Sequence, residues 1–375
     1  MTSLHHVCFV APHAYLVLAK DAPLQLVGGA EIQQCLIAKH LVKRGYRISM
    51  ICLDFGQPDD LVISGIRIVK AHKPDEGLPV LRFVHPRLTS IWQAMKRVNA
   101  EIYYQRTAAA LTGLVAMFCR LNGKKMIYSA ASDSDFISGK QRIHYRRDRL
   151  IYQWGLKHSD LIIAQSTKQQ RLCKKNYNRD SIYIRSCCEL SSNASNDEKD
   201  FDVLWVSTIK PNKRPEIFLQ LARKLPDLSF KMVGGSSNGN NWEPYFCQIK
   251  EQAAGISNLE FVGFVPYEEI DRYFNTSRIF VNTSEYEGFP NTFLQSWVRG
   301  IPTVSFINPE AVIKGQQVGV VVNSIDKMIL KIKELIVSVH QYAAVGDICK
   351  EYVGQFHSIE KIVDEYSKVF TSLTA

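Results

Sequence analysis

Short runs of aliphatic residues alternate with helix-like segments along this 375-residue chain, and they form two successive series. The first series of strand-like runs comprises 7–10, 48–53, 66–69, 102–104, 126–128, 161–164 and 182–184. The second series comprises 203–206, 230–233, 259–262, 279–281, 303–306 and 318–322. Such alternation is typical of parallel sheets with helices on both faces, and the length exceeds what one hydrophobic core usually serves. The sequence therefore predicts two doubly wound, Rossmann-like α/β domains.

A polar stretch separates the two series. Residues 189–200 read ELSSNASNDEKD and have no apolar face, which is typical of a linker. We therefore predict an N-terminal domain at 1–190 and a C-terminal domain at 200–358. Apolar residues recur at helical spacing in 359–375, so this segment is predicted to be an amphipathic helix.

The stretch 285–297, EYEGFPNTFLQSW, places an acid directly before a Gly-Phe turn and an apolar helix. It follows a strand-like run and precedes GIPTVS at 300–305, which combines a glycine helix stop with another strand. In such a unit the loop lies at the carboxyl end of the sheet, where free amides at a helix N-terminus attract a phosphate. Glu287 is therefore predicted at the mouth of a ligand site.

This stretch resembles the signature of the family-four retaining glycosyltransferases of the GT-B fold, in which seven residues separate two glutamates. Glu287 matches the first acid, which in the family holds the donor sugar together with the following amides, here those of Gly288 and Phe289. Gln295 stands where the family has the acid that binds the nucleotide ribose. An amide binds ribose less strongly than a carboxylate, because charge-assisted hydrogen bonds are about twice as strong as neutral ones. The resemblance also implies donor binding by Asn291.

A second match to this family is the segment 203–222, which reads as a buried strand, a basic loop and a helix. In the family this loop carries an Arg and then a Lys, and both reach the donor diphosphate. Lys213 matches the Lys, whereas Thr208 stands at the position of the Arg. Lys210 and Arg214 are nearby cations that could supply the missing charge, which two phosphates need for binding and for departure of the nucleoside diphosphate.

A third match is the glycine turn at 28–31, GGAE, which opens a helix. Glycine lets the backbone approach a phosphate closely, although it also makes ordinary turns. The resemblance implies that Gly29 lies near the donor phosphate. In GT-B proteins a C-terminal helix such as 359–375 also crosses back onto the first domain.

The run 130–135, AASDSD, follows another strand-like run. Family members often have a His near this place, close to the reacting sugar, and Asp133 or Ser132 is predicted in that role here. An Asp-Ser-Asp string is also the pattern by which the other glycosyltransferase fold, GT-A, binds manganese. The two Rossmann-like halves and Glu287 favour GT-B, in which cations and helix dipoles replace the metal, so we expect no metal ion and no cofactor.

The resemblance implies transfer of a sugar from a UDP- or GDP-sugar to a glycan or polyprenyl-diphosphate-linked acceptor, with retention of configuration. The leaving diphosphate accepts the acceptor's proton, so catalysis depends on positioning and charge stabilisation. Glu287, Lys213 and Asp133 are the expected catalytic residues. The expected setting is the assembly of bacterial surface polysaccharide or lipopolysaccharide.

Two other functions remain open. A GT-B sugar-nucleotide epimerase shares the donor site but needs an acid or base beside carbon two of the sugar. A non-catalytic GT-B partner subunit is the other alternative, because Thr208, Gln295 and the missing His depart from the family pattern.

Most of the net charge of +10 lies in the segment 140–179, where eleven Lys and Arg residues stand against two Asp residues. Basic residues mix there with Ile, Leu, Tyr and Trp, a composition suited to an anionic membrane surface or a lipid-linked acceptor. A solvated basic helix whose apolar residues belong to the core fits equally well. Nucleic acid is not an expected partner, because no recognised nucleic-acid-binding module accompanies the charge.

No run approaches the roughly eighteen apolar residues of a spanning helix, and the N-terminus lacks the pattern of an export signal. Nine cysteines without paired spacing fit reduced thiols. We therefore expect a cytoplasmic protein, with peripheral contact to the inner face of the cell membrane through 140–179.

Overall fold

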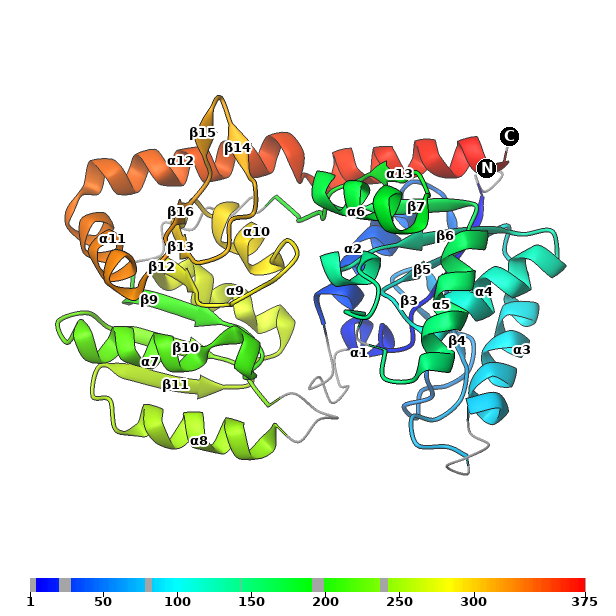
Figure 1. Cartoon of the computed structure of the whole chain (residues 1–375), viewed down its shortest axis with the longest axis horizontal. Helices are drawn as coiled ribbons and strands as arrows, with labels where there is room; N and C mark the ends of the chain where they lie inside the picture. Colours follow the sequence, from blue (N-terminus) through cyan, green and yellow to red (C-terminus); the bar gives the residue numbers. More distant parts are fainter. Residues whose placement is uncertain are drawn as a thin grey trace. The chain divides into compact units, whose positions relative to one another are not determined.

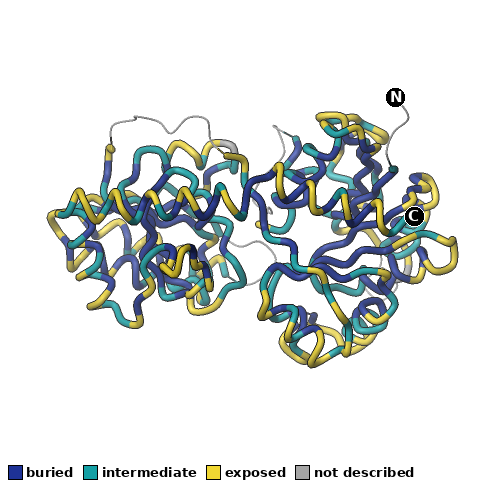
Figure 2. Tube along the Cα trace, turned by 90° about the horizontal axis from the view of Figure 1, so that it is seen from above, coloured by how far each residue is buried: buried dark blue, intermediate teal, exposed yellow. Residues whose placement is uncertain are grey.

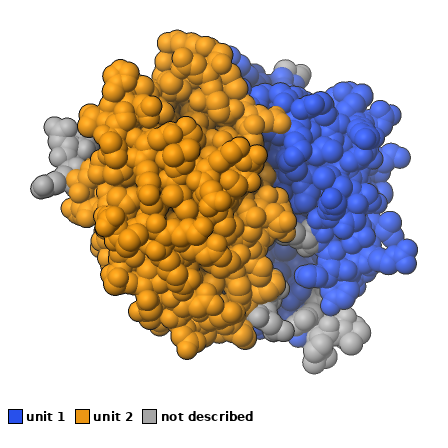
Figure 3. Space-filling view, turned by 60° about the vertical axis from the view of Figure 1, so that its left-hand side comes forward, with its two compact units in different colours: residues 1–23, 27–187, 359–375 blue, residues 24–26, 188–358 orange. Residues whose placement is uncertain are grey.

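The computed structural model describes residues 5–19, 28–77, 83–141, 143–190, 199–236 and 242–374. Their contacts divide the chain into two compact units (Figure 3). The first contains residues 27–187 and 359–375 together with the N-terminal segment, and the second contains 188–358. Most of the predicted linker, 191–198, lies outside the described residues.

The first unit contains an eight-stranded sheet in the order β3-β4-β2-β1-β5-β6-β7-β8. Its strands are β1 His6–Val10, β2 Arg47–Cys52, β3 Leu61–Ile63, β4 Ile66–Lys70, β5 Ile102–Arg106, β6 Lys125–Ser129, β7 Leu161–Ala164 and β8 Ile182–Tyr183. β3 runs antiparallel to β4, and the other neighbours pair in parallel. The chain builds outward from β1 through β2 and then resumes on its other side with β5. The topological switch point of this sheet therefore lies between β1 and β5.

Helices cover both faces of this sheet (Figure 1). They are α1 Tyr15–Leu18, α2 Gly29–Lys43, α3 Thr89–Val98, α4 Ala110–Leu121, α5 Arg146–His158, α6 Thr167–Tyr177 and α13 Ile359–Thr374. α2 and α13 bury apolar side chains against one face, and α3, α4 and α5 bury theirs against the other. On α13, Tyr366 and Phe370 pack edge to face against Tyr104 and Tyr46 of the first unit.

The second unit contains a parallel six-stranded sheet in the order β11-β10-β9-β12-β13-β16. Its strands are β9 Phe201–Val206, β10 Phe230–Val233, β11 Leu259–Gly263, β12 Ser277–Asn282, β13 Thr303–Ser305 and β16 Val320–Val321. A short hairpin, β14 Val312–Ile313 and β15 Gln316–Gln317, stands apart from this sheet. The chain runs from β9 to β11 on one side and returns to β12 on the other. The switch point of the second sheet therefore lies between β9 and β12, where open α/β sheets bind ligands.

The helices of the second unit also form a layer on each face of their sheet. They are α7 Pro215–Lys224, α8 Glu243–Ala254, α9 Tyr267–Thr276, α10 Asn291–Trp297, α11 Ile325–Val337 and α12 Val339–Phe356. α7, α8 and α11 share one buried cluster with the strands, and α9, α10 and α12 share the other. Figure 2 shows the strands as buried and the outer faces of the helices as exposed.

The predicted fold class, two doubly wound α/β domains, is confirmed. Every predicted strand-like run overlaps a strand of one of the two sheets. Gly45 follows the end of α2 with a φ of 89°, in the left-handed region that favours glycine after a helix. The short strands β3, β14 and β15 were not predicted.

Candidate functional site

The loops that follow β9 and β12 are joined by hydrogen bonds at the switch point of the second unit. The hydroxyl of Thr283 donates to the carbonyl of Lys213 at 2.6 Å, and it accepts the indole N–H of the buried Trp205 at 2.9 Å. The amide of Glu285 donates to the carbonyl of Asn212 at 2.9 Å. Strand order brings these two loops together, and the contacts fix their relative position.

An ion pair connects the same two loops. Lys213 Nζ lies 2.7 Å from Glu287 Oε2, and the two side chains are only 14% and 16% exposed. The other carboxylate oxygen accepts hydrogen bonds from Asn282 Nδ2, at 3.1 Å, and from the hydroxyl of Ser284. The sequence analysis named Lys213 and Glu287 separately, and the structure places them in contact.

Glu287 is held in its ionised form by these neighbours. Burial by itself raises the pKa of this carboxyl group, but the Lys213 ammonium and the hydrogen bonds from Ser284 and Asn282 outweigh it. The net pKa of Glu287 is lower than that of an ordinary glutamate. The site therefore presents one positive and one negative group side by side at neutral pH.

Arg214 anchors the basic loop. Its backbone has a φ of 46°, a left-handed conformation that is uncommon for a residue with a Cβ. Its Nε donates to the carbonyl of Thr283 at 2.9 Å, and its guanidinium lies 4.8 Å from the ring centre of Phe306. Thr208, at the family's Arg position, is exposed, and Lys210 is half-buried.

The loop after Glu287 is fixed by an aromatic side chain. The ring of Phe289 stacks on His357, with centroids 4.9 Å apart, and meets Trp297 edge to face at 5.9 Å. α10 then starts at Asn291 and contains seven residues, with Pro290 as its N-cap. Gly288 is half-buried between these points. The side chain of Phe289 therefore has a packing role, whatever its backbone amide binds.

Gln295 lies on α10 with a buried amide. Its Nε2 has no hydrogen-bond partner in the described part of the chain, while its backbone carbonyl accepts Arg299 Nη1 at 2.8 Å. Leaving a buried donor unpaired costs about 1–3 kcal/mol, so such groups usually have a partner in the functional state. A ribose hydroxyl can accept from the amide nitrogen and donate to the amide oxygen.

The remaining predicted site residues lie in the first unit. Gly29 is the first residue of α2, and Gly28 before it is extended and has Glu31 Oε2 only 2.8 Å from where a Cβ would stand. The loop before these glycines lies largely outside the described residues. Asp133 forms an ion pair with Lys168 at 2.8 Å.

Side chains in and next to the Asp-Ser-Asp string bind nearby backbone amides. The carboxylate of Asp135 accepts the amides of Ala131, at 2.8 Å, and Ser132, at 3.3 Å, and burial raises its pKa. Ser132 accepts the amide of Ser134 and thereby caps the short helix Asp133–Phe136. Within the described ranges, no group of three or more His, Cys, Asp or Glu side chains is placed to hold a metal ion.

The basic segment 140–179 has some apolar side chains in the core and others at the surface. On α5, Tyr152 and Leu156 are buried in the core of the first unit, as the alternative of a solvated helix predicts. Tyr145 and Leu150 are 67% and 66% exposed, and Arg146 and Arg147 beside them are exposed too. Arg142 lies outside the described residues. In the part of the chain that the structure describes, no helix is both long and apolar enough to cross a membrane.

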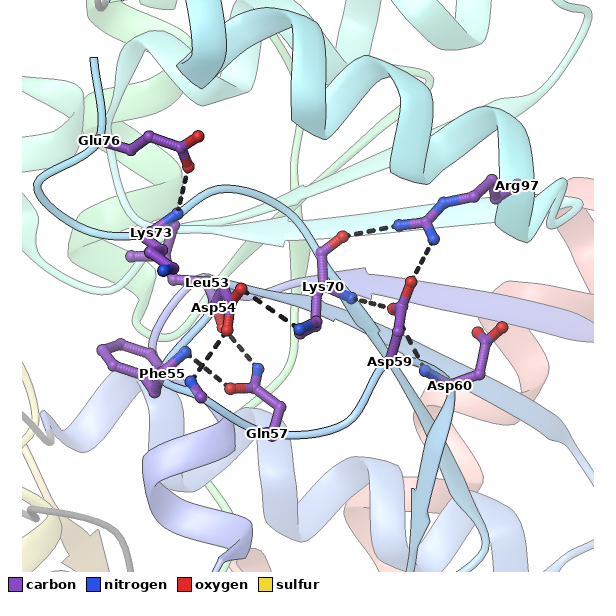
Figure 4. Close-up of polar contacts among 11 residues, drawn as sticks. Leu53, Asp54, Phe55, Gln57, Asp59, Asp60, Lys70, Lys73, Glu76 and Arg97 are labelled. Carbon is purple, nitrogen blue, oxygen red and sulfur yellow. Dashed lines mark hydrogen bonds and ion pairs between the residues drawn. The ribbon is translucent and has the colours of Figure 1, made fainter.

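A second polar network joins the loop after β2 to the end of β4 and to α3 (Figure 4). Asp54 pairs with Lys70 Nζ at 3.3 Å, and Asp59 pairs with Arg97 and accepts the amide of Lys70 at 3.0 Å. Burial raises the pKa of both aspartates, but these contacts outweigh it and the net pKa of each is lowered. These pairs tie α3 and the loop after β2 to the end of β4.

The residues around Glu287 that the sequence analysis missed are Asn282, Thr283 and Ser284. Asn282 ends β12, and Thr283 and Ser284 follow it; they orient Glu287 or connect the two loops. Polar residues at the carboxyl end of a buried strand were the available signal. Such residues lie at the edge of a parallel sheet where ligands bind.

Two family models match the chain. Glycosyltransferase Family 4 matches residues 27–186, and Glycosyl transferases group 1 matches residues 189–346. An uncharacterised glycosyltransferase of Haemophilus influenzae is 22% identical over 363 residues, which are 91% of this chain and 96% of that protein. The O-antigen biosynthesis glycosyltransferase WbnH of Escherichia coli is 28% identical over 110 residues, which are 29% of each chain.

Solved structures show the same fold over the whole chain. Sucrose-phosphate synthase from Thermosynechococcus elongatus has a TM-score of 0.80 at 15% identity and covers 99% of both chains. Anabaena HepE in complex with UDP-glucose has a TM-score of 0.73 at 15% identity and covers 98% of this chain and 100% of its own. These likenesses show the GT-B fold, and the two family matches show that the chain is a family-four-type glycosyltransferase.

Proposed function

We propose that this glycosyltransferase moves a sugar from a UDP- or GDP-sugar to a glycan or polyprenyl-diphosphate-linked acceptor, with retention of configuration and without a metal ion. The observation that carries the proposal is the Lys213–Glu287 pair at the switch point of the second unit. It supplies a cation for the donor diphosphate and an anion for the donor sugar on neighbouring loops.

The chemistry follows from these two charges. The Lys213 ammonium stabilises the negative charge that grows on the diphosphate as the bond to the sugar breaks. Glu287 accepts hydrogen bonds from sugar hydroxyls and fixes the ring, while Gln295 binds the ribose. On the retaining route the leaving diphosphate takes the acceptor's proton, so no protein nucleophile is required. We also propose that the backbone at Gly29 lies close to the donor phosphate and that Asp133 lies near the reacting sugar.

The relatives support the substrate classes. HepE was solved with UDP-glucose, and WbnH is described as an O-antigen biosynthesis glycosyltransferase. We therefore place the reaction in the assembly of a cell-surface polysaccharide, at the inner face of the membrane. Tyr145, Leu150 and the arginines beside them are the surface that we expect to contact anionic lipid.

The test is a panel of UDP- and GDP-sugars incubated with the purified chain and candidate acceptors, with products identified by mass spectrometry and the anomeric configuration by NMR. Transfer with retained configuration supports the proposal. A donor converted to its epimer without transfer supports the epimerase instead. Donor binding without any product identifies a non-catalytic partner subunit.

Chelation provides a separate prediction. Since Lys213 is expected to neutralise the diphosphate, transfer activity should be unchanged after EDTA treatment and dialysis. The rate is measured with and without added manganese and magnesium. Complete loss of activity, restored by manganese, would contradict the metal-free mechanism and point back to Asp133 and Asp135.

Gln295 gives a third prediction. Changing Gln295 to Leu should weaken UDP binding by about 1–3 kcal/mol, because ribose hydroxyls then face a side chain that cannot pair with them. Gln295→Glu should bind UDP equally or more tightly, because the hydroxyls donate to a charged acceptor. Calorimetric titration measures both, with thermal unfolding as the control for the fold. UDP binding by Gln295→Leu at the wild-type level would place the ribose elsewhere.

A further inference from the structure

A buried cation ends the central strand of the first unit. Arg106 is the last residue of β5 and only 6% exposed, and its Nε has no hydrogen-bond partner in the described part of the chain. Among the groups that interact electrostatically with this side chain are the neutral phenols of Tyr104 and Tyr366. Guanidinium stays protonated in proteins, so Arg106 brings a full positive charge into the interior. A buried charge is unfavourable unless an anion accompanies it.

The carboxyl group that interacts electrostatically with Arg106 does not meet this need. Asp135 directs its Oδ2 to the amide of Ala131, at 2.8 Å, and to the hydroxyl of Tyr128, at 3.3 Å. Tyr128, which hydrogen-bonds Asp135, belongs to the buried cluster on one face of the sheet. Tyr104, which lies near Arg106, belongs to the cluster on the other face. Burial also raises the pKa of Asp135, which disfavours its charged form. Within the described ranges, no ion pair between Arg106 and a carboxylate is found.

A second unpaired group lies next to Arg106. Ser129 ends β6 and is the register partner of Arg106 in the parallel β5–β6 pair. Register partners on neighbouring strands point to the same face of a sheet and are about 4.8 Å apart. Ser129 is fully buried, and its Oγ has no hydrogen-bond partner among the residues described. A fixed cation and a hydroxyl donor therefore stand together at the carboxyl edge of the sheet.

The backbone around this pair is held in an unusual conformation. Thr107 has a φ of 74°, which is strained for a β-branched residue, and its amide donates to the carbonyl of Ser129 at 3.1 Å. Gln105 Nε2 donates to the carbonyls of Arg106, at 2.7 Å, and Thr107, at 2.8 Å. Thr107 is half-buried, so the loop above the pair reaches the surface. Arg106 ends β5 beside the switch point between β1 and β5, where ligands of doubly wound sheets bind, and Ser129 ends the next strand, β6.

We propose that Arg106 and Ser129 form an anion-binding subsite for a phosphate group of the acceptor. The planar guanidinium can bind two phosphate oxygens, and the Ser129 hydroxyl can donate to a third. This inference rests on the proposed function, because it assigns an acceptor to the transferase. The acceptor is then a phosphorylated molecule, either a lipid-linked diphosphate or a soluble sugar phosphate.

Phosphate binding to the full chain tests the subsite. The Lys213→Gln variant removes the cation expected to bind the donor diphosphate, and inorganic phosphate is titrated into it by calorimetry. Adding Arg106→Gln should weaken phosphate binding roughly tenfold to a hundredfold, and adding Ser129→Ala about twofold to tenfold. Arg97→Gln, which removes a paired arginine of the same unit, is the matched control and should leave phosphate binding unchanged. Unchanged binding in the Arg106 and Ser129 variants overturns the proposal.

The Ser129→Ala variant separates a role of this subsite in phosphate binding from a purely structural role of Arg106. If Arg106→Gln does not fold, Ser129→Ala decides, because it leaves the buried cation in place. Weaker phosphate binding by a Ser129→Ala variant with wild-type thermal stability supports the subsite, and unchanged binding overturns it. Titration of the wild-type chain with UDP and with GDP tests the proposed function separately from this inference. Absence of binding of both UDP and GDP contradicts the proposed function, whereas phosphate binding that is unchanged in the Arg106 and Ser129 variants contradicts only this inference.

Competition identifies the source of the phosphate. Farnesyl diphosphate and glucose 6-phosphate are each titrated against bound inorganic phosphate in the Lys213→Gln variant. Displacement by farnesyl diphosphate alone assigns a lipid-linked acceptor, and displacement by the sugar phosphate assigns a soluble one. Failure of both to displace phosphate overturns the assignment of the subsite to an acceptor.

Discussion

Replacing Glu287 by Gln is expected to lower kcat/KM for the preferred donor roughly tenfold to a hundredfold, which corresponds to about 1.5–3 kcal/mol for one charge-assisted hydrogen bond. The loss arises because a neutral amide holds the sugar hydroxyls less strongly than the carboxylate. The variant keeps the shape of the side chain, so Asn282 and Ser284 can still contact it. Steady-state kinetics with the donor identified by the sugar-nucleotide panel measures the effect.

Glu285→Gln is the matched control for this prediction. Glu285 lies on the same loop, but its side chain is exposed, whereas that of Glu287 is 16% exposed. We expect near-wild-type kinetics from the control and an unchanged unfolding temperature in both variants. Wild-type kcat/KM in Glu287→Gln would show that this carboxylate does not bind the donor sugar and would remove the main support for the proposed function.

The fold could be predicted because most of its strands are long enough to be recognised as apolar runs in the sequence. A buried parallel strand such as β9 or β12 is a nearly continuous apolar run, and the segments between such runs have helical periodicity. β3, β14 and β15 contain only two or three residues. β8 and β16 are equally short, but they lie within the predicted apolar runs 182–184 and 318–322. A run of two or three residues carries no periodicity by itself, and pairing with a neighbour decides whether it becomes a strand.

The candidate site was predicted residue by residue but not as a contact. Lys213 and Glu287 stand far apart in the sequence, and their meeting depends on β12 inserting beside β9 rather than beside β11. Strand order is a property of the whole sheet, which no local motif encodes. The sequence could therefore predict both as site residues, and only the fold shows that they form an ion pair.

Arg106 and Ser129 illustrate a different limit. Each ends an apolar strand, where a polar residue is ordinary and attracts no attention in a sequence. Their proximity depends on the register of β5 and β6, in which the two residues are partners. The absence of hydrogen-bond partners for Arg106 Nε and Ser129 Oγ among the described residues depends on their neighbours in space. Neither property can be read from one strand alone.

The basic loop should dominate binding of the nucleoside diphosphate, so Lys213→Gln is expected to weaken UDP binding roughly tenfold to a hundredfold. Two effects act in the same direction. The variant loses the cation that contacts the phosphates, and it leaves the ionised Glu287 unpaired beside them. Lys224→Gln, an exposed cation at the end of α7, is the control and should bind UDP normally. Calorimetric titration with UDP measures both variants.

The double variant Lys213→Gln/Glu287→Gln separates these two effects. Glu287→Gln alone should bind UDP equally or more tightly than the wild type, because it removes a carboxylate that competes with phosphate for the Lys213 ammonium. The double variant removes the repulsion but still lacks the cation, so its UDP affinity should lie between those of Lys213→Gln and the wild type. Full recovery of UDP binding in the double variant would mean that Lys213 serves only to neutralise Glu287. The diphosphate would then have to be held by other groups, with Lys210 the first candidate on the same loop.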